Sequence, residues 1–156
     1  MTSNIKSIKQ ALNPAFLKQK PERKEIEFFK KEFINLLNHI KNTEEKETEE
    51  HYKIDVMNFL NAVYYKDKHY INTKGKTDLV IHNENDVTAS VGVLIETKSP
   101  TNKTEMVRRD NLNVKSFHEL VLYYLRERKT GKNLELRYLI VTNIYEWFVF
   151  DARNFE

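Results

Sequence analysis

The feature that most constrains the fold is a change in the spacing of apolar residues along the chain. Between residues 26 and 64, apolar residues recur every three or four positions, as in helices with one buried face. From residue 68 the pattern changes to short runs rich in β-branched and aromatic residues, "HYINT", "TDLVIH" and "VGVLIET". Helical spacing returns over residues 111–129, and the strand-like runs "LRYLIVT" and "YEWFVFD" follow. The pattern therefore predicts helices packed on a sheet.

This order predicts an α/β fold with a central mixed sheet of about five strands flanked by helices, in the order α-α-β-β-β-α-β-β. The 156 residues suit a single domain spanning 1–156. Its expected parts are an N-terminal arm over 1–20, with Phe16 and Leu17 as anchors, and helices over 21–65. A three-strand meander over 68–99, a helix over 111–129 and two strands over 134–151 follow, with Gly131 ending the helix.

Composition excludes several classes of protein. There are no cysteines, which removes disulfide frameworks and thiolate metal sites. No apolar run reaches the length of a membrane span, and the N-terminus "MTSNIKSIKQ" lacks the apolar core of a secretory signal. We therefore expect a cytoplasmic protein with no membrane partner.

Charge is distributed unevenly although the net charge is only +3. Residues 44–50, "EEKETEE", are strongly acidic, whereas residues 103–132 are rich in lysine and arginine. A locally basic segment can follow a phosphate backbone even when the whole chain is near neutral. A solvated helix face explains the same charges, and from this feature alone it is the favoured interpretation.

Three charged residues stand at the ends of two strand-like runs. Asp78 opens "TDLVIH", and Glu96 and Lys98 close "VGVLIETK". Because side chains alternate along a strand with a rise of about 3.3 Å per residue, Glu96 and Lys98 share a face. If the two runs pair as a hairpin, Asp78 lies beside both, and the loop over 83–90 lies at the far end. The sequence therefore predicts two carboxylates and an ammonium at one edge of the sheet.

This grouping suits metal-dependent chemistry. Two adjacent carboxylates repel each other unless a cation intervenes, and hard oxygen ligands select Mg²⁺ or Mn²⁺. A coordinated water is easier to deprotonate and can attack phosphorus, while Lys98 orients it or stabilises charge on phosphate. The alternative is that Asp78 merely starts a strand and that Glu96 and Lys98 form an exposed ion pair. Because both acids stand at the ends of strands expected to pair, the pattern favours phosphodiester hydrolysis.

The segments "KTD" at 76–78 and "ETK" at 96–98 resemble the motif of the PD-(D/E)xK nuclease superfamily. Over nearly the whole chain, "NPAFLKQKPERKEIEFFK", "YINTKGKTDLVIHN", "VGVLIETKSPTNKTEM" and "TNIYEWFVFDA" resemble the N-terminal nuclease region of type IIG restriction-modification enzymes. The resemblance implies a restriction-endonuclease-like core. One departure is Thr77, which stands where the superfamily's name has proline.

The resemblance also implies roles for individual residues. Asp78 and Glu96 match the metal-binding acids, with the backbone carbonyl of Thr97 as a further ligand, and Lys98 matches the catalytic lysine. Some members add an acid from the first core helix. The choice here is Glu50, or else Glu49, and a solvated helix start explains these acids about equally well. Contacts to the DNA backbone are expected from exposed residues after the motif: Lys103, Asn113, Lys115 and Ser116.

The function that follows is a Mg²⁺-dependent DNA endonuclease domain of a restriction-modification enzyme, in which Mn²⁺ substitutes for Mg²⁺. Its expected partners are double-stranded DNA, methyltransferase and target-recognition domains in a longer parent chain, and a second copy in a transient dimer on DNA. The alternative is a catalytically inactive nuclease-fold module that binds DNA or docks to a partner. A third hypothesis, a domain that mainly holds protein neighbours, requires a large exposed apolar patch.

Overall fold

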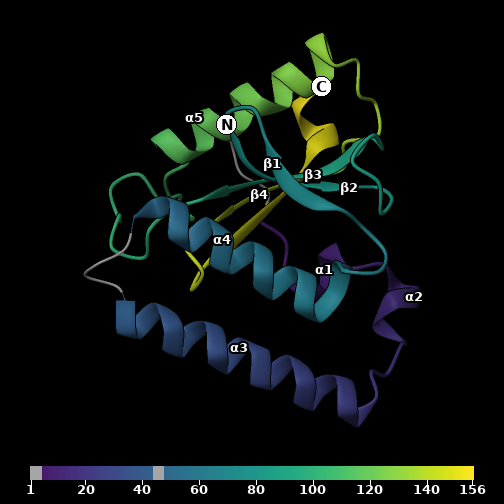
Figure 1. Ribbon diagram of the computed structural model, residues 1–156. Coiled ribbons are helices and arrows are strands. Elements are labelled where there is room, and N and C mark those ends of the chain that lie inside the picture. Colours follow the sequence, from purple (N-terminus) through teal and green to yellow (C-terminus); the bar gives the residue numbers. More distant parts are fainter. Residues whose placement is uncertain (1–4, 44–47) are drawn as a thin grey trace.

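A five-stranded sheet forms the middle layer of the protein, with α3 and α4 on one face and α5 on the other (Figure 1). This computed structural model describes residues 5–43 and 48–156. Residues 1–4 of the predicted arm and residues 44–47 of the acidic run therefore lie outside the described part. The layers agree with the predicted α/β class and with a mixed sheet flanked by helices.

The strands lie in the sheet in the order in which they occur in the chain, β1-β2-β3-β4-β5. Their bounds are Ile71–Lys74 for β1, Thr77–His82 for β2, Val91–Thr97 for β3, Tyr138–Thr142 for β4 and Trp147–Asp151 for β5. The first three strands pair antiparallel, as the meander predicts, and β4 and β5 also pair antiparallel. β3 and β4 pair parallel, because the chain crosses over the sheet through α5 before it returns.

The described residues form more helices than the apolar spacing predicts, because two short helices precede the predicted ones. The α-helices are α1 (Ile8–Ala11), α2 (Pro14–Leu17), α3 (Arg23–Thr43), α4 (Glu49–Leu60) and α5 (Lys115–Leu125). α4 and α5 each continue into a π-helical turn, η1 (Asn61–Tyr65) and η2 (Arg126–Thr130), and a 3-10 turn, η3 (Ala152–Phe155), follows β5. No helix in the described ranges is long and apolar enough to cross a membrane.

Two predicted segments need correction. The arm contains the short helices α1 and α2, because Ser7 and Asn13 cap the first turns with their side chains. Its expected anchors Phe16 and Leu17 are 60% and 44% exposed. The helix expected from residue 111 begins at Lys115, since the preceding residues form an isolated bridge between positions 108 and 111. Gly131 follows η2 directly, as predicted.

The core consists of two apolar clusters, one on each face of the sheet. The cluster under α5 includes Leu94 and Leu120, and the cluster under α3 and α4 includes Ile95 and Tyr52. Leu94 and Ile95 are neighbours on β3 with no exposed surface, so β3 is buried on both faces, as its unbroken apolar run predicts. Burial of each such side chain contributes about 1.5–3 kcal/mol. This rigid central strand fixes the position of Glu96, which follows Ile95.

Candidate functional site

The β2–β3 hairpin brings Asp78 beside Glu96, as the sequence predicts. Leu79 pairs with Ile95, so the preceding Asp78 lies level with the following Glu96. The backbone N–H and the hydroxyl of Thr97 each donate to Asp78 Oδ2 at 2.8 Å. These two hydrogen bonds hold the Asp78 carboxylate beside the end of β3.

A third carboxylate comes from the first turn of α4. Oxygen atoms of Glu49, Asp78 and Glu96 all lie within 4.8 Å of one another. Glu50, the first choice from the sequence, instead pairs with Lys53 at 2.6 Å and its side chain is 64% exposed. Successive helical residues are rotated by about 100°, so only one of two adjacent acids can face the site. The sequence prediction is therefore corrected from Glu50 to its alternative, Glu49.

Lys98 lies among the carboxylates of Glu49, Glu96 and Glu119 and is almost fully enclosed. Its Nζ is 2.7 Å from Glu96, 2.8 Å from Glu49 and 3.0 Å from Glu119, and only 4% of its side chain is exposed. Burial lowers the pKa of Lys98, but the hydrogen bonds to Glu49, Glu96 and Glu119 outweigh this and raise it above its usual range. Lys98 is therefore a buried ammonium at neutral pH.

Glu96 is a buried carboxyl group with an unusual proton affinity. Burial, and then the negative charge of Asp78, raises its pKa to about 9, although Lys98 opposes the shift. Its Oε2 atom is buried and accepts no hydrogen bond. A buried carboxylate oxygen without a donor is costly unless it meets a cation. The donor set and this oxygen both fit a divalent metal ion held by Glu49, Asp78 and Glu96.

A family model matches residues 6–156, which is nearly the whole chain. The chain belongs to the DUF7149 family, a domain of unknown function. No curated protein and no solved structure matches it. The family description names no activity, so function must be inferred from the site.

Two residues of α5 complete the site of this DUF7149 domain and were missed by the sequence analysis. Glu119 contacts Lys98, and it lies close enough to Glu96 to share a hydrogen bond when one of the two acids is protonated. Tyr123 lies one turn further along, and burial together with the charges of Glu96 and Glu119 raises its pKa to about 12. The sequence does contain a signal for these two residues. In the apolar stretch "FHELVLYYL", an acid and a tyrosine stand four positions apart, a spacing that places both on one face of a helix.

The residues predicted to contact the DNA backbone differ in their surroundings. Lys103 and Asn113 are exposed, and Lys115 is exposed but pairs with Glu105 at 3.1 Å. Ser116 is fully buried, because the start of α5 packs onto the loop before it, and its hydroxyl has no surface available to a phosphate. The prediction for Ser116 is therefore corrected. The Thr97 carbonyl remains a predicted ligand, since the contacts above involve only the N–H and hydroxyl of that residue.

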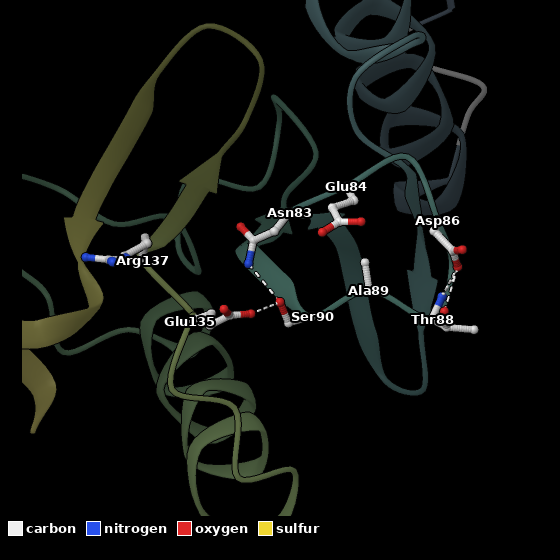
Figure 2. A pocket seen from close by; sticks show the side chains of 8 residues that line it. All are labelled: Asn83, Glu84, Asp86, Thr88, Ala89, Ser90, Glu135 and Arg137. Carbon is white, nitrogen blue, oxygen red and sulfur yellow. Dashed lines mark hydrogen bonds between the residues drawn. The ribbon is translucent and has the colours of Figure 1, made fainter.

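A surface hollow of about 520 Å³ lies at the other end of the β2–β3 hairpin (Figure 2). Its charged side chains are Glu84, Asp86, Glu135 and Arg137. Figure 2 shows Ser90 between Asn83 and Glu135, hydrogen-bonded to both. The hollow flanks the loop over 83–90, whereas Asp78 and Glu96 lie at the opposite ends of these strands. It is therefore separate from the acidic site of the DUF7149 domain.

Proposed function

We propose that this DUF7149 domain is a divalent-cation-dependent DNA endonuclease with a restriction-endonuclease-like core. The observation that carries the proposal is the grouping of the Glu49, Asp78 and Glu96 carboxylates at the end of β3, with Lys98 bonded to Glu49 and Glu96. The order of α3, α4, a three-strand meander, the crossover helix α5 and two strands supports the superfamily that the "TD…ETK" motif resembles.

Mg²⁺, with Mn²⁺ as a substitute, is the proposed cofactor. Glu49, Asp78 and Glu96 would hold the ion, because three carboxylates supply the hard oxygen ligands that these ions prefer. When bound, the ion supplies Lewis acidity and lowers the pKa of coordinated water. The hydrogen bonds from Thr97 keep Asp78 in place before the ion arrives.

Lys98 acts in this proposal as a charged donor and not as a base. Its raised pKa keeps the amine protonated at neutral pH, so it has no free lone pair to accept a proton. A fixed ammonium stabilises the negative charge that develops on a phosphate oxygen during hydrolysis. Lys103 and Lys115, which both follow the "ETK" motif in the sequence, are proposed to contact the DNA backbone.

The proposed biological setting is that of a type IIG restriction-modification enzyme. Double-stranded DNA is the substrate, and methyltransferase and target-recognition domains in a longer parent chain would supply sequence specificity. A transient dimer on DNA would place one site on each strand. These partners rest on the resemblance of the sequence alone.

Nicking of supercoiled plasmid DNA in Mg²⁺ or Mn²⁺ tests the function. Removal of a catalytic charge typically costs about 10²–10³ in rate, so Asp78→Asn and Lys98→Ala should nick at least about 100-fold more slowly than the unaltered protein. Glu84→Gln is a matched control, because it removes a carboxylate from the separate hollow. Chelation should stop all nicking. Cleavage by both site variants at the unaltered rate would rule out the assignment.

A non-catalytic DNA-binding or docking module is the second candidate. It is favoured by the Lys98 ammonium, which is already bonded to Glu49 and Glu96, two of the three carboxyl groups that would hold the cation. An ion that binds the folded state raises the melting temperature. Absence of a Mn²⁺-induced thermal shift, together with DNA binding that weakens with salt, would select this module over the nuclease.

A further inference from the structure

We propose that Glu119 is a positioning residue that holds the Lys98 ammonium while a divalent cation occupies the Glu49–Asp78–Glu96 site. The inference rests on the proposed function, since it concerns the cation-loaded state of the same site. It assigns a role to a residue of α5 that lies outside the strand motif.

The geometry gives Lys98 three close carboxylates, of which two also belong to the cation site. These are Glu96 at 2.7 Å and Glu49 at 2.8 Å from Nζ. A cation bound to these oxygens competes for the same lone pairs and repels the ammonium. Glu119, at 3.0 Å, is then the close acceptor that the cation does not use.

Glu105 is the other acid near Lys98, and its contacts make it a weaker acceptor for the ammonium. Its Oε2 atom is 4.0 Å from Lys98 Nζ, outside hydrogen-bond distance. The same carboxylate already accepts hydrogen bonds from Lys115 at 3.1 Å and from Asn102 at 3.1 Å. The Glu105 and Glu119 side chains are each 29% exposed. Glu105 is therefore a matched control for Glu119 in charge, size and exposure.

The backbone of Glu119 is held firmly enough to position a partner. The next residue, Leu120, has no exposed surface and belongs to the core cluster between α5 and the sheet. Tyr123, one turn further along α5, is 8% exposed. Because its neighbours are packed on the sheet, the backbone of Glu119 stays in place beside Lys98.

The inference makes the effect of losing Glu119 depend on the cation. Without a cation, Glu49 and Glu96 still hold Lys98 in a Glu119→Gln variant, so the lysine stays enclosed. With a cation, the variant leaves Lys98 without a close carboxylate, whereas the unaltered protein does not. Glu105→Gln should resemble the unaltered protein in both states.

Acylation of lysine amines, read by mass spectrometry at Lys98, measures this directly and does not require DNA cleavage. A charge-assisted hydrogen bond is worth about 1.5–3 kcal/mol, so the Lys98 labelling rate of Glu119→Gln in Mn²⁺ should rise by about tenfold or more. Without Mn²⁺ the Lys98 labelling rate of Glu119→Gln should rise clearly less than in Mn²⁺, because Glu49 and Glu96 still hold the ammonium, and Glu105→Gln should match the unaltered protein. In a parallel nicking assay, Glu119→Gln should lower the single-turnover rate by about tenfold while the Mn²⁺ concentration at half-maximal rate stays within about twofold.

The outcomes separate this inference from the proposed function. In one outcome, the unaltered protein binds Mn²⁺ and nicks DNA, but in Mn²⁺ Lys98 of Glu119→Gln is labelled as slowly as in the unaltered protein. Glu119 then does not hold Lys98, and the nuclease assignment stands. An equal rise in Glu105→Gln would also overturn the specific role of Glu119. If the unaltered protein shows neither a Mn²⁺ thermal shift nor nicking, the proposed function fails, and the inference fails with it.

Discussion

At Glu96, burial and the negative charge of Asp78 both raise the pKa of the carboxyl group. Only 3% of its side chain is exposed and Asp78 lies beside it, so its pKa rises to about 9. In the unfolded chain the pKa returns to about 4.5. Between these two values the folded, cation-free domain binds more protons than the unfolded chain. Its stability should therefore fall as pH rises through this window.

A divalent cation should displace this proton from Glu96. At pH 7 the cation-free group is protonated, and an ion that uses its oxygens requires the carboxylate, so binding should release close to one proton. Affinity should then rise about tenfold per pH unit below pH 9. Calorimetric titration with Mn²⁺ in two buffers of different ionisation enthalpy measures the release. Glu96→Gln should abolish it, and proton-neutral binding by the unaltered protein would contradict the raised pKa.

The place of a single residue in the site was predictable only where it follows from the residue's own strand or from pairing with the adjacent strand. Glu96 and Lys98 share one strand, and pairing of adjacent strands brings Asp78 to them, so all three follow from alternation and hairpin geometry. The choice between Glu49 and Glu50 depends on the rotation of a helix within an acidic run, which composition does not specify. The contact of Glu119 with Lys98 depends on how α5 docks on the sheet, which no local pattern encodes.

At the scale of elements, the turn between β4 and β5 departs most from its sequence signal. The strand-like runs "LRYLIVT" and "YEWFVFD" leave only "NI" between them, but the strands end at Thr142 and resume at Trp147. Ile144 adopts φ +77°, a region that disfavours β-branched residues, and it is 2% exposed. The Ile144 N–H donates to the Thr142 hydroxyl, and the Trp147 indole donates to the Ile144 carbonyl. These bonds and the buried side chain hold the strained backbone.

Because of this strain, we expect Ile144→Gly to be more stable than Ile144→Ala, which reverses the usual order of these two substitutions. Both Ile144→Gly and Ile144→Ala lose a buried side chain, which costs about 2–5 kcal/mol. Glycine removes the backbone strain of about 1–2 kcal/mol and alanine does not, so the glycine variant should be the more stable by about 1 kcal/mol.

Urea unfolding midpoints of the two Ile144 variants compare them under one condition. Elsewhere in a strand or helix, glycine is usually the less stable of the two. An alanine variant as stable as the glycine variant would mean that the turn relaxes to negative φ and that Ile144 carries no strain.

At the scale of the whole molecule, the site joins both halves of the core. The helices α4 and α5 lie on opposite faces of the sheet (Figure 1). Glu49 of α4 and Glu119 of α5 both contact Lys98, which directly follows β3. The layered α/β architecture was predictable because the apolar period changes at each element. The parallel pairing of β3 with β4 depends on the crossover through α5, which periodicity alone does not define.

The proposed function requires a divalent cation between Glu49, Asp78 and Glu96, beside Lys98. The most direct measurement is the anomalous diffraction of Mn²⁺ in crystals of this DUF7149 domain. We expect a peak within bonding distance of oxygen atoms from all three carboxylates, with Lys98 retained by Glu119. Crystals that show no peak at saturating Mn²⁺, with Lys98 still bonded to Glu49 and Glu96, would contradict it.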